Sequence, residues 1–403
     1  MRSLPETPEE TRAAASNLPG IEQILTFSYG DLDRTLRTMR LRSGASLLQG
    51  CLPLLLQEVP TDNLIERIGS ERYEQLQGCY LELCLLNLWF NLEQQRVFEA
   101  ITAANIPLMV LKGADIALTC YPQPDLRYFD DVDLLVHPED LRATTMILER
   151  LGYTYHQEYR FEAISEQRSG FVYARQVANG YVVFEVHTAP HANELGVTFD
   201  VADLWRRARP VTLHGIQVQA MSLEDLLLFL CWHYRSHFFE RLIWLYDVTM
   251  LLLAHGSQLD WMRLYRLARR QGMLATVYYV LGWCQQLFKV ALPPEAHLER
   301  FAPPVYVQWL VKCLIGDDTS AVLRPSMVNG RKMLQHLMVD DLKALGLTEL
   351  RAIFPSPTHL GRLYMEHSRL PLRLFWLYYF WHPFVALKHA WRIVSYKRRG
   401  SRR

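Results

Sequence analysis

The chain has 403 residues, enough for two or three domains or for one catalytic domain with helical additions. Its 43 Lys and Arg residues almost balance its 42 Asp and Glu residues, so the net charge of +1 gives no bulk electrostatic argument for nucleic-acid binding or for an acidic substrate. The seven cysteines are odd in number and form no C-x-x-C pair, which argues against a disulfide framework or a zinc knuckle and predicts a reducing, cytoplasmic location.

The first hundred residues are predicted to be a leader followed by helices. Residues 1–20 carry acidic residues where a signal peptide has a basic start and an apolar run, so we expect a mobile leader. From residue 21 to 105, as in "YLELCLLNLWFNLEQQRVFEAI", apolar residues recur at intervals of three and four. That spacing predicts a helical N-terminal region.

Between residues 106 and 220 the hydrophobic period changes to that of strands. The stretches "PLMVLKG", "DVDLLVH", "GFVYARQV", "YVVFEVHTA" and "IQVQAM" are short, rich in β-branched or aromatic residues, and bounded by Gly, Pro, Asn or Asp. One helix is predicted among them, opened by Pro138 and closed by Gly152. The pattern predicts a compact α+β unit.

From residue 221 to 314 the helical period returns. Ser222 is suited to cap the first helix of this region, and Glu224 and Asp225 are suited to its first turn. The stretch "LLLFLCWHYRSHFFERLIWLYDVTMLLLAH" continues the helical pattern up to Gly256. A second helical region is therefore expected after the α+β unit.

The end of the chain is predicted to be an exposed loop, 315–332, followed by C-terminal helices with a basic tail, 333–403. The apolar segment 370–391 is interrupted by Pro383 and by charged residues, which argues against a transmembrane helix. Two readings stay open for residues 370–403. They pack on the preceding helices, or they contact a membrane surface in plane, where anionic lipid would attract the tail "YKRRGSRR".

The stretch "FDDVDLLV" places three acidic residues directly before an apolar run. Because side chains alternate along a strand, Asp131 and Asp133 point to one face, and Asp130 is expected beside this pair as a supporting residue. Two such charges about 4 Å apart repel by roughly 4 kcal/mol at an effective dielectric constant near 20. A divalent cation would remove that cost, and Mg²⁺ (or Mn²⁺) is the natural candidate.

A third carboxylate comes from "YVVFEVHTAP", where Glu185 interrupts an apolar strand and shares a face with His187. Three acids on adjacent strands can hold two metal ions, one activating an attacking oxygen and one bridging a triphosphate and its leaving group. This arrangement suggests nucleotidyl transfer. For His187, a supporting role behind the acids, a proton relay and a satisfied core histidine all stay open.

Residues suited to phosphate precede the acids. Lys112 and Gly113 end a predicted strand, where glycine permits close backbone approach to phosphate and the lysine can neutralise it. Arg127, four residues before Asp131, can hold a second phosphate oxygen bidentately or can brace the acidic cluster structurally.

Taken together, "VLKGADIALTCYPQPDLRYFDDVDLLV", "LERLGYTY", "FEVHTAP" and "HYRSHFFERLIWLYDV" resemble the family of uncharacterised nucleotidyltransferases of the DNA polymerase β-like superfamily, over residues 21–294. The resemblance implies a minimal nucleotidyltransferase fold, which is a short mixed sheet with flanking helices. It also implies two-metal transfer of a nucleotide from an NTP.

Carried over position by position, Asp131 and Asp133 match the metal-binding pair of the family, and Glu185 matches its third acidic position. The residues that match its phosphate-side signature are Lys112, Gly113 and Arg127. The chain departs from the wider superfamily in having alanine after Gly113, where serine is usual, and a longer gap before the acids. Serine-mediated phosphate contact is therefore not expected.

Four further residues lie in the second helical region. His233 and His237 share a helix face, but without H-E-x-x-H or a nearby cysteine a structural or substrate-pocket role is favoured over metal binding. Arg241 and Asp247 are expected to form a buried or half-buried ion network that joins these helices to the α+β unit.

Two rival functions stay open beside a nucleotidyltransferase. The first is a catalytically silent nucleotide-binding or scaffold protein, and the second is a membrane-surface protein in envelope or polysaccharide assembly. The acceptor, the base preference and the oligomeric state have no readable signal, and nothing in the chain strongly indicates nucleic acid as a partner.

Overall fold

The fold is described from a computed structural model of the chain. Its described residues are 50–156, 170–178, 180–190, 197–317, 322, 327–340, 354, 377–378 and 380–384. The predicted leader, 1–20, and the basic tail, 396–403, lie outside them.

Within the described part of the chain, seven strands form one sheet in the order β3-β4-β5-β2-β1-β7-β6. They are β1 (Met109–Val110), β2 (Val132–Leu135), β3 (Thr154–Tyr155), β4 (Gly170–Val177), β5 (Gly180–His187), β6 (Arg209–Leu213) and β7 (Ile216–Ala220). Strand β2 pairs parallel to β5 and antiparallel to β1, and β1 pairs parallel to β7. The sheet is therefore mixed, and the predicted α+β fold class is confirmed.

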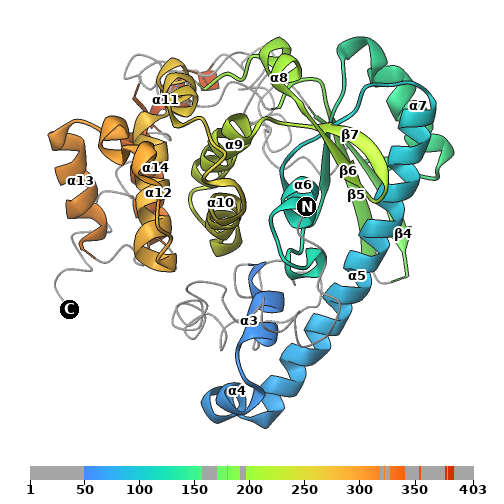
Figure 1. The fold of residues 1–403 in the computed structure, drawn as a ribbon, viewed down its shortest axis with the longest axis horizontal. Coiled ribbons are helices and arrows are strands. Elements are labelled where there is room, and N and C mark those ends of the chain that lie inside the picture. Colours follow the sequence, from blue (N-terminus) through green and yellow to red (C-terminus); the bar gives the residue numbers. More distant parts are fainter. Residues whose placement is uncertain are drawn as a thin grey trace.

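Helices cover both faces of this sheet. The N-terminal helices are α3 (Leu52–Glu58), α4 (Thr61–Ile68) and α5 (Ser70–Ala103), and α5 packs against β5 and β7. On the other side, α6 (Lys112–Thr119) contacts β2 and lies between the sheet and α10 (Leu242–His255). Figure 1 shows α5 running along one side of the sheet and α6 on the opposite side.

Residues of the central strands alternate between two apolar clusters. Leu134 and Val186 belong to the cluster beneath α5, whereas Leu135 belongs to the cluster formed with the second helical region. Because side chains alternate along a strand, Asp133 and Glu185 are expected on the side of α6 and α10, opposite to α5.

The second helical region consists mainly of α9 (Leu223–Ser236), α10, α11 (Trp261–Arg270), α12 (Leu274–Phe288), α13 (Val305–Ile315) and α14 (Val328–Leu337). The predicted cap of α9 is confirmed, because the Asp225 amide donates to Ser222 Oγ at 3.2 Å. The helical stretch before Gly256 is divided into α9 and α10, and Phe238 and Phe239 at the break both have φ of 55°. Helix α14 begins inside the range where the sequence predicts a loop.

The prediction of one helix within 106–220 was wrong. The predicted helix is present as α7 (Leu141–Arg150), preceded by the 3₁₀ turn Pro138–Asp140, but α6 and α8 (Val201–Arg207) also lie there. Both have eight residues or fewer. So short a segment holds barely two helical turns, too few for a hydrophobic period to be recognised. Three other 3₁₀ turns complete the elements: Pro124–Leu126, Pro294–Ala296 and Leu298–Phe301.

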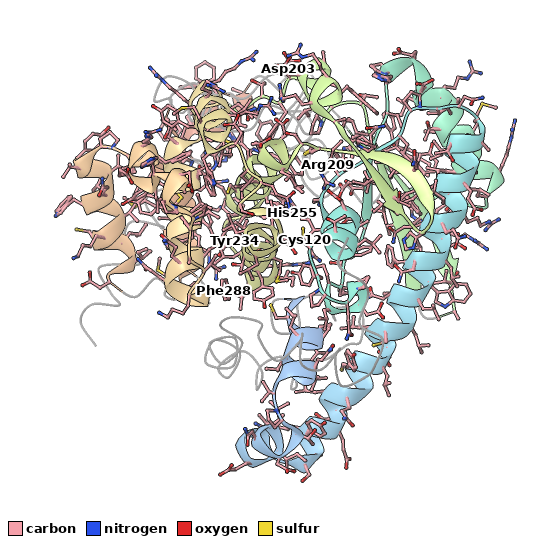
Figure 2. All side chains as sticks on the ribbon, viewed as in Figure 1. Cys120, Asp203, Arg209, Tyr234, His255 and Phe288 are labelled. Carbon is pink, nitrogen blue, oxygen red and sulfur yellow. The ribbon has the colours of Figure 1, made fainter. Side chains whose placement is uncertain are left out.

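An ion pair to a buried carboxylate joins β6, at the edge of the sheet, to α6. Arg209 of β6 donates to the fully buried Asp115 of α6, with an Nη2–Oδ2 distance of 2.6 Å. In Figure 2, Arg209 lies near His255, the last residue of α10, where the two sides of the molecule meet. The pair therefore fixes α6 against the edge of the sheet, beside the end of α10.

None of the helices in the described part of the chain combines the length and the apolar character that crossing a membrane requires. Three aromatic side chains near the C-terminus, Phe380, Trp381 and Phe384, are 67%, 62% and 69% exposed. Contact of residues 370–403 with a membrane surface stays a prediction.

Candidate active site

The strand register brings two of the predicted acids together. Asp133 of β2 lies directly opposite Glu185 of β5 in the parallel pairing of these strands. The pairing continues past β2, where the Val136 amide donates to the His187 carbonyl at 3.0 Å. Two neighbouring strands therefore present Asp133, Glu185 and His187 as one group, which we term the acid group.

The side chains of this group meet within hydrogen-bonding distance. His187 Nε2 lies 3.1 Å from Asp133 Oδ1 and 3.4 Å from Glu185 Oε2. One ligand atom from each of the three residues lies within 4.8 Å of the others, which is close enough to share a metal ion. Asp133 and His187 are buried, whereas the Glu185 side chain is 29% exposed. Solvent therefore reaches the three side chains from the side of Glu185.

Lys112 completes the charge pattern on Asp133. Its Nζ lies 3.0 Å from Asp133 Oδ2, so this carboxylate is held by a lysine on one oxygen and by an imidazole on the other. Burial alone would lower the pKa of Lys112, but the charges of Asp131, Asp133 and Glu185 outweigh it and raise that pKa. Lys112 therefore stays a cation.

Asp131 stands directly before β2 and is half-buried. Its pKa is raised, first by burial and then by the negative charges of Asp133, Glu185 and Asp130, while the charge of Lys112 opposes the rise. The negative charges of these acids therefore act on Asp131, but Asp131 does not belong to the close group formed by Asp133, Glu185 and His187. The convergence of Asp131 with Asp133 on one metal site stays a prediction.

The pKa of His187 is set by two opposing causes. Burial favours the neutral ring, but the hydrogen bonds to Asp133 and Glu185 outweigh burial and raise the pKa to about 9. At neutral pH the imidazole is therefore positively charged, and its Nε2–H is placed to donate to the two carboxylates.

Lys112 and Gly113 open helix α6 and do not end a strand, since β1 ends at Val110. The first backbone amides of α6 have no partner inside the helix, and its macrodipole is positive at this end. A Cβ added at Gly113 would meet Phe129 at 3.6 Å, an ordinary contact. The packing of the protein itself therefore does not require glycine at this position.

Arg127 lies in a different environment from Lys112. Its Nε and Nη2 atoms donate to Asp247 of α10 at 2.7 Å each, and Nη1 donates to the Tyr128 carbonyl. The whole side chain is buried. These contacts are those of the alternative reading, a structural brace, and the phosphate role of Arg127 stays a prediction without a supporting contact.

The expected ion network between the helices and the α+β unit is present. Besides the Arg127–Asp247 pair, Arg241 Nη1 donates to Asp130 Oδ2 at 2.9 Å. Asp130 is thus paired with Arg241 and is not one of the three residues of the close group. The network ties the start of α10 to the residue next to Asp131.

The break between α9 and α10 brings together the rings of His233, His237 and Trp244, and the two histidines were predicted to have a structural or substrate-pocket role. The ring of His237 lies 4.5 Å from that of His233 and 4.9 Å from that of Trp244, between centroids. Burial and the nearby charges of Lys112 and Arg241 lower the pKa of His237 to about 4. The half-buried, neutral His237 therefore lies within electrostatic reach of the acid group; its only sequence signal was the i, i+4 spacing from His233.

Comparison with known proteins places the chain in a family. No curated protein matches it. Among solved structures, it is similar to ANT(2'')-Ia in complex with adenylyl-2''-tobramycin, at 17% identity over 44% of this chain and 92% of that chain, with a TM-score of 0.31. It is also similar to the lincomycin-bound lincosamide antibiotic adenylyltransferase LnuA, at 16% identity over 40% of this chain and 94% of that chain, with a TM-score of 0.28.

A third similar structure is an antigenic nucleotidyltransferase-like protein from Paracoccidioides brasiliensis, at 14% identity over 47% of this chain and 91% of that chain, with a TM-score of 0.28. The model of one protein family, described as uncharacterised nucleotidyltransferase, matches residues 48–289. Since this match spans more than half of the 403 residues and includes every residue of the acid group, the chain belongs to the uncharacterised nucleotidyltransferase family.

Proposed function

We propose that the protein transfers an NMP group from an NTP to a hydroxyl or phosphate of an acceptor, with Mg²⁺ or Mn²⁺ held at the acid group. The observation that carries the proposal is the convergence of Asp133, Glu185 and His187 within 4.8 Å, with Lys112 3.0 Å from Asp133. In such a transfer the acceptor oxygen bonds to the α-phosphorus as the bond to pyrophosphate breaks.

The residues present fit a divalent cation. Asp133 and Glu185 offer carboxylate oxygens, which are the donors that Mg²⁺ and Mn²⁺ prefer, and Asp131 supplies a further carboxylate beside them. In the two-metal arrangement we propose, Asp131, Asp133 and Glu185 would hold the cations, which would activate the acceptor oxygen and neutralise charge on the leaving pyrophosphate. A bound cation would neutralise the acids and stabilise charge on the transferring phosphoryl group.

The protein's own cations have distinct tasks in this proposal. Lys112 and the amino end of α6 would bind the triphosphate. Lys112 supplies a positive charge 3.0 Å from Asp133, and the first amides of α6 have no partner inside the helix. His187 would hold Asp133 and Glu185 in place through Nε2. Neither task requires Arg127, whose donors are directed to Asp247 and a backbone carbonyl.

Calorimetry with each NTP in the presence of Mg²⁺ tests the proposal, comparing the wild-type protein with the Asp131→Asn/Asp133→Asn variant. We expect metal-dependent binding by the wild type and its loss in the variant. Asp130→Asn is the matched control, because it removes a neighbouring carboxylate that pairs with Arg241 instead. Wild-type protein that binds no NTP would overturn the proposal.

Turnover is tested separately, by following release of pyrophosphate with a panel of hydroxyl and phosphate acceptors. We expect Asp133→Asn to abolish turnover without unfolding the protein. Metal-dependent NTP binding without turnover on any acceptor would instead favour a catalytically silent nucleotide-binding protein.

A further inference from the structure

The imidazole of His187 lies directly against Gly170, the first residue of β4. These two residues face each other in the antiparallel pairing of β4 and β5. A Cβ added at Gly170 would lie 2.8 Å from both Cε1 and Nδ1 of His187. Side-chain carbons do not approach so closely, so any residue other than glycine at this position would displace the ring or the strand.

The backbone does not explain why position 170 is glycine. Gly170 is absent from the residues with positive φ, so its conformation is one that other residues adopt readily. A glycine inside a strand also weakens the strand, since it packs no side chain there. The contact with His187 is the feature of this position that requires glycine.

The ring of His187 has little freedom to move away. It is 2% exposed, and its Nε2 is engaged by Asp133 at 3.1 Å and Glu185 at 3.4 Å. A displacement that relieved a clash at Gly170 would push Nε2 toward the carboxylates or rotate it out of line with them. Either change would alter the positions of the carboxylate oxygens.

At two other glycines of the α+β unit an added Cβ would cause no clash. Gly180 lies at the opposite end of the same β4–β5 hairpin, and a Cβ there would meet only Leu86 Cδ1, at 3.6 Å. A Cβ at Gly113 would likewise make only ordinary contacts. Of these three glycines, Gly170 is the one at which an added Cβ would clash.

We infer that Gly170 is a positioning residue for the acid group, in which the absence of a side chain lets the His187 ring stand where it orders Asp133 and Glu185. The inference rests on the proposed function, because it takes these two carboxylates to be ligands of the divalent cation. Gly170 of β4 would therefore support the metal site although it has no side chain that could bind a metal.

The test is calorimetric titration of the full chain with Mn²⁺ in the absence of NTP. We expect Gly170→Ala to weaken Mn²⁺ binding about 10-fold or more, which is typical when the support of a ligand is disturbed. Gly180→Ala is the matched control and is expected to bind as the wild type does. Equal Mn²⁺ affinity of Gly170→Ala and wild type, with equal thermal midpoints, would overturn the inference.

A double-mutant cycle with His187→Ala separates positioning from a general loss of structure. Because the clash needs the ring, Gly170→Ala should add less than 2-fold to the loss that His187→Ala alone causes. A full additional loss in the His187→Ala background would show that Gly170 acts by another route and would refute the inference.

Should Gly170→Ala fail to fold, His187→Ala alone decides the matter. This variant leaves a small cavity in place of the ring and is expected to fold yet to bind Mn²⁺ about 10-fold more weakly. Unchanged affinity would refute the inference while leaving the proposed function intact. Wild-type protein that binds neither Mn²⁺ nor NTP would overturn both.

Discussion

Asp133 carries the densest set of contacts in the candidate site. One of its oxygens faces the Lys112 ammonium at 3.0 Å and the other faces His187 Nε2 at 3.1 Å, while its backbone carbonyl accepts from the Leu111 amide at 3.0 Å. A buried carboxylate is tolerated only when its charge is compensated. Lys112 and His187 supply that compensation, and a divalent cation would share it.

Replacing Lys112 by methionine should change the affinities for NTP and for Mn²⁺ differently. NTP affinity should fall about 10-fold, since a cation at the phosphate side is lost, whereas Mn²⁺ binding without NTP should be unchanged or tighter, because the ammonium no longer competes for Asp133. Calorimetry measures both. Lys312→Met, which removes an exposed lysine, is the control. A parallel loss of both affinities would contradict the role assigned to Lys112.

The pH dependence of stability should report on His237. Its pKa is about 4 in the folded protein and 6.5 in the unfolded chain, so between these values the unfolded state binds a proton that the folded state does not. The charged groups that act on it are Lys112 and Arg241, which lower the pKa, and Asp133, which raises it. The contribution of His237 to stability is therefore complete above pH 6.5 and decreases as the pH falls toward 4.

Urea unfolding of the wild type and of His237→Asn between pH 7 and pH 4.5 measures this contribution. The free energy of unfolding of the wild type should decline more steeply than that of the variant as the pH falls. All other titrating groups are common to both proteins, so the difference isolates His237. Parallel curves would mean that His237 titrates normally in the folded protein.

At the scale of single elements, local chemistry explains where α9 begins. Ser222 Oγ accepts from the Asp225 amide and donates to Asp225 Oδ2 at 2.7 Å, while Arg207 of α8 donates to the same carboxylate from outside the helix. The cap therefore also fixes α8 against α9. Helix α9 in turn carries His233 and ends just before His237, so its starting point influences the position of the break beside the acid group.

Ser222→Ala should lower the free energy of unfolding by about 1 kcal/mol, within the range of 0.5–2 kcal/mol found for N-cap residues. Urea unfolding of the full chain measures the change. The matched control is Ser236→Ala at the other end of α9, whose hydroxyl donates to the His233 carbonyl, and it should cost about 0.5 kcal/mol or less. Equal costs at the two ends would show that the cap is not what stabilises the start of α9.

At the scale of the whole molecule, the sheet and the second helical region are held together by buried charges. Arg127 and Asp247 are separated by 120 residues in the chain, and Tyr121 also donates to Asp247, at 2.9 Å. Removing one partner of a buried pair leaves an uncompensated charge, whereas replacing both by apolar residues can be nearly neutral. The pair therefore specifies how the two regions dock.

Asp247→Asn should lower the free energy of unfolding by about 3 kcal/mol, because it leaves Arg127 buried without a counter-charge. The Arg127→Met/Asp247→Leu variant should recover most of this loss. Asp317→Asn, which breaks the exposed Lys312–Asp317 pair, serves as the control and should have far less effect. A double variant as unstable as Asp247→Asn would mean that the pair does more than compensate charge.

The sequence by itself determined which residues share a face. Alternation in "FDDVDLLV" and "YVVFEVHTAP" predicted that the acids of each strand point one way, and Ser222 predicted the start of α9. These features follow from side-chain periodicity and from local hydrogen bonds, which depend on residues only a few positions apart. The α+β class followed from the same local patterns, whereas the family resemblance rested on the motifs "LKG", "DDVDLLV" and "FEVHTAP" themselves.

Only the tertiary structure decided which faces meet. The parallel register of β2 and β5 puts Asp133 opposite Glu185, and Arg127 pairs with Asp247, 120 residues further along the chain. The short helix α6 was likewise not predictable, because an element of about two turns leaves no readable period. Which residues pair depends on packing between segments that are distant in sequence, and local sequence patterns do not predict that packing.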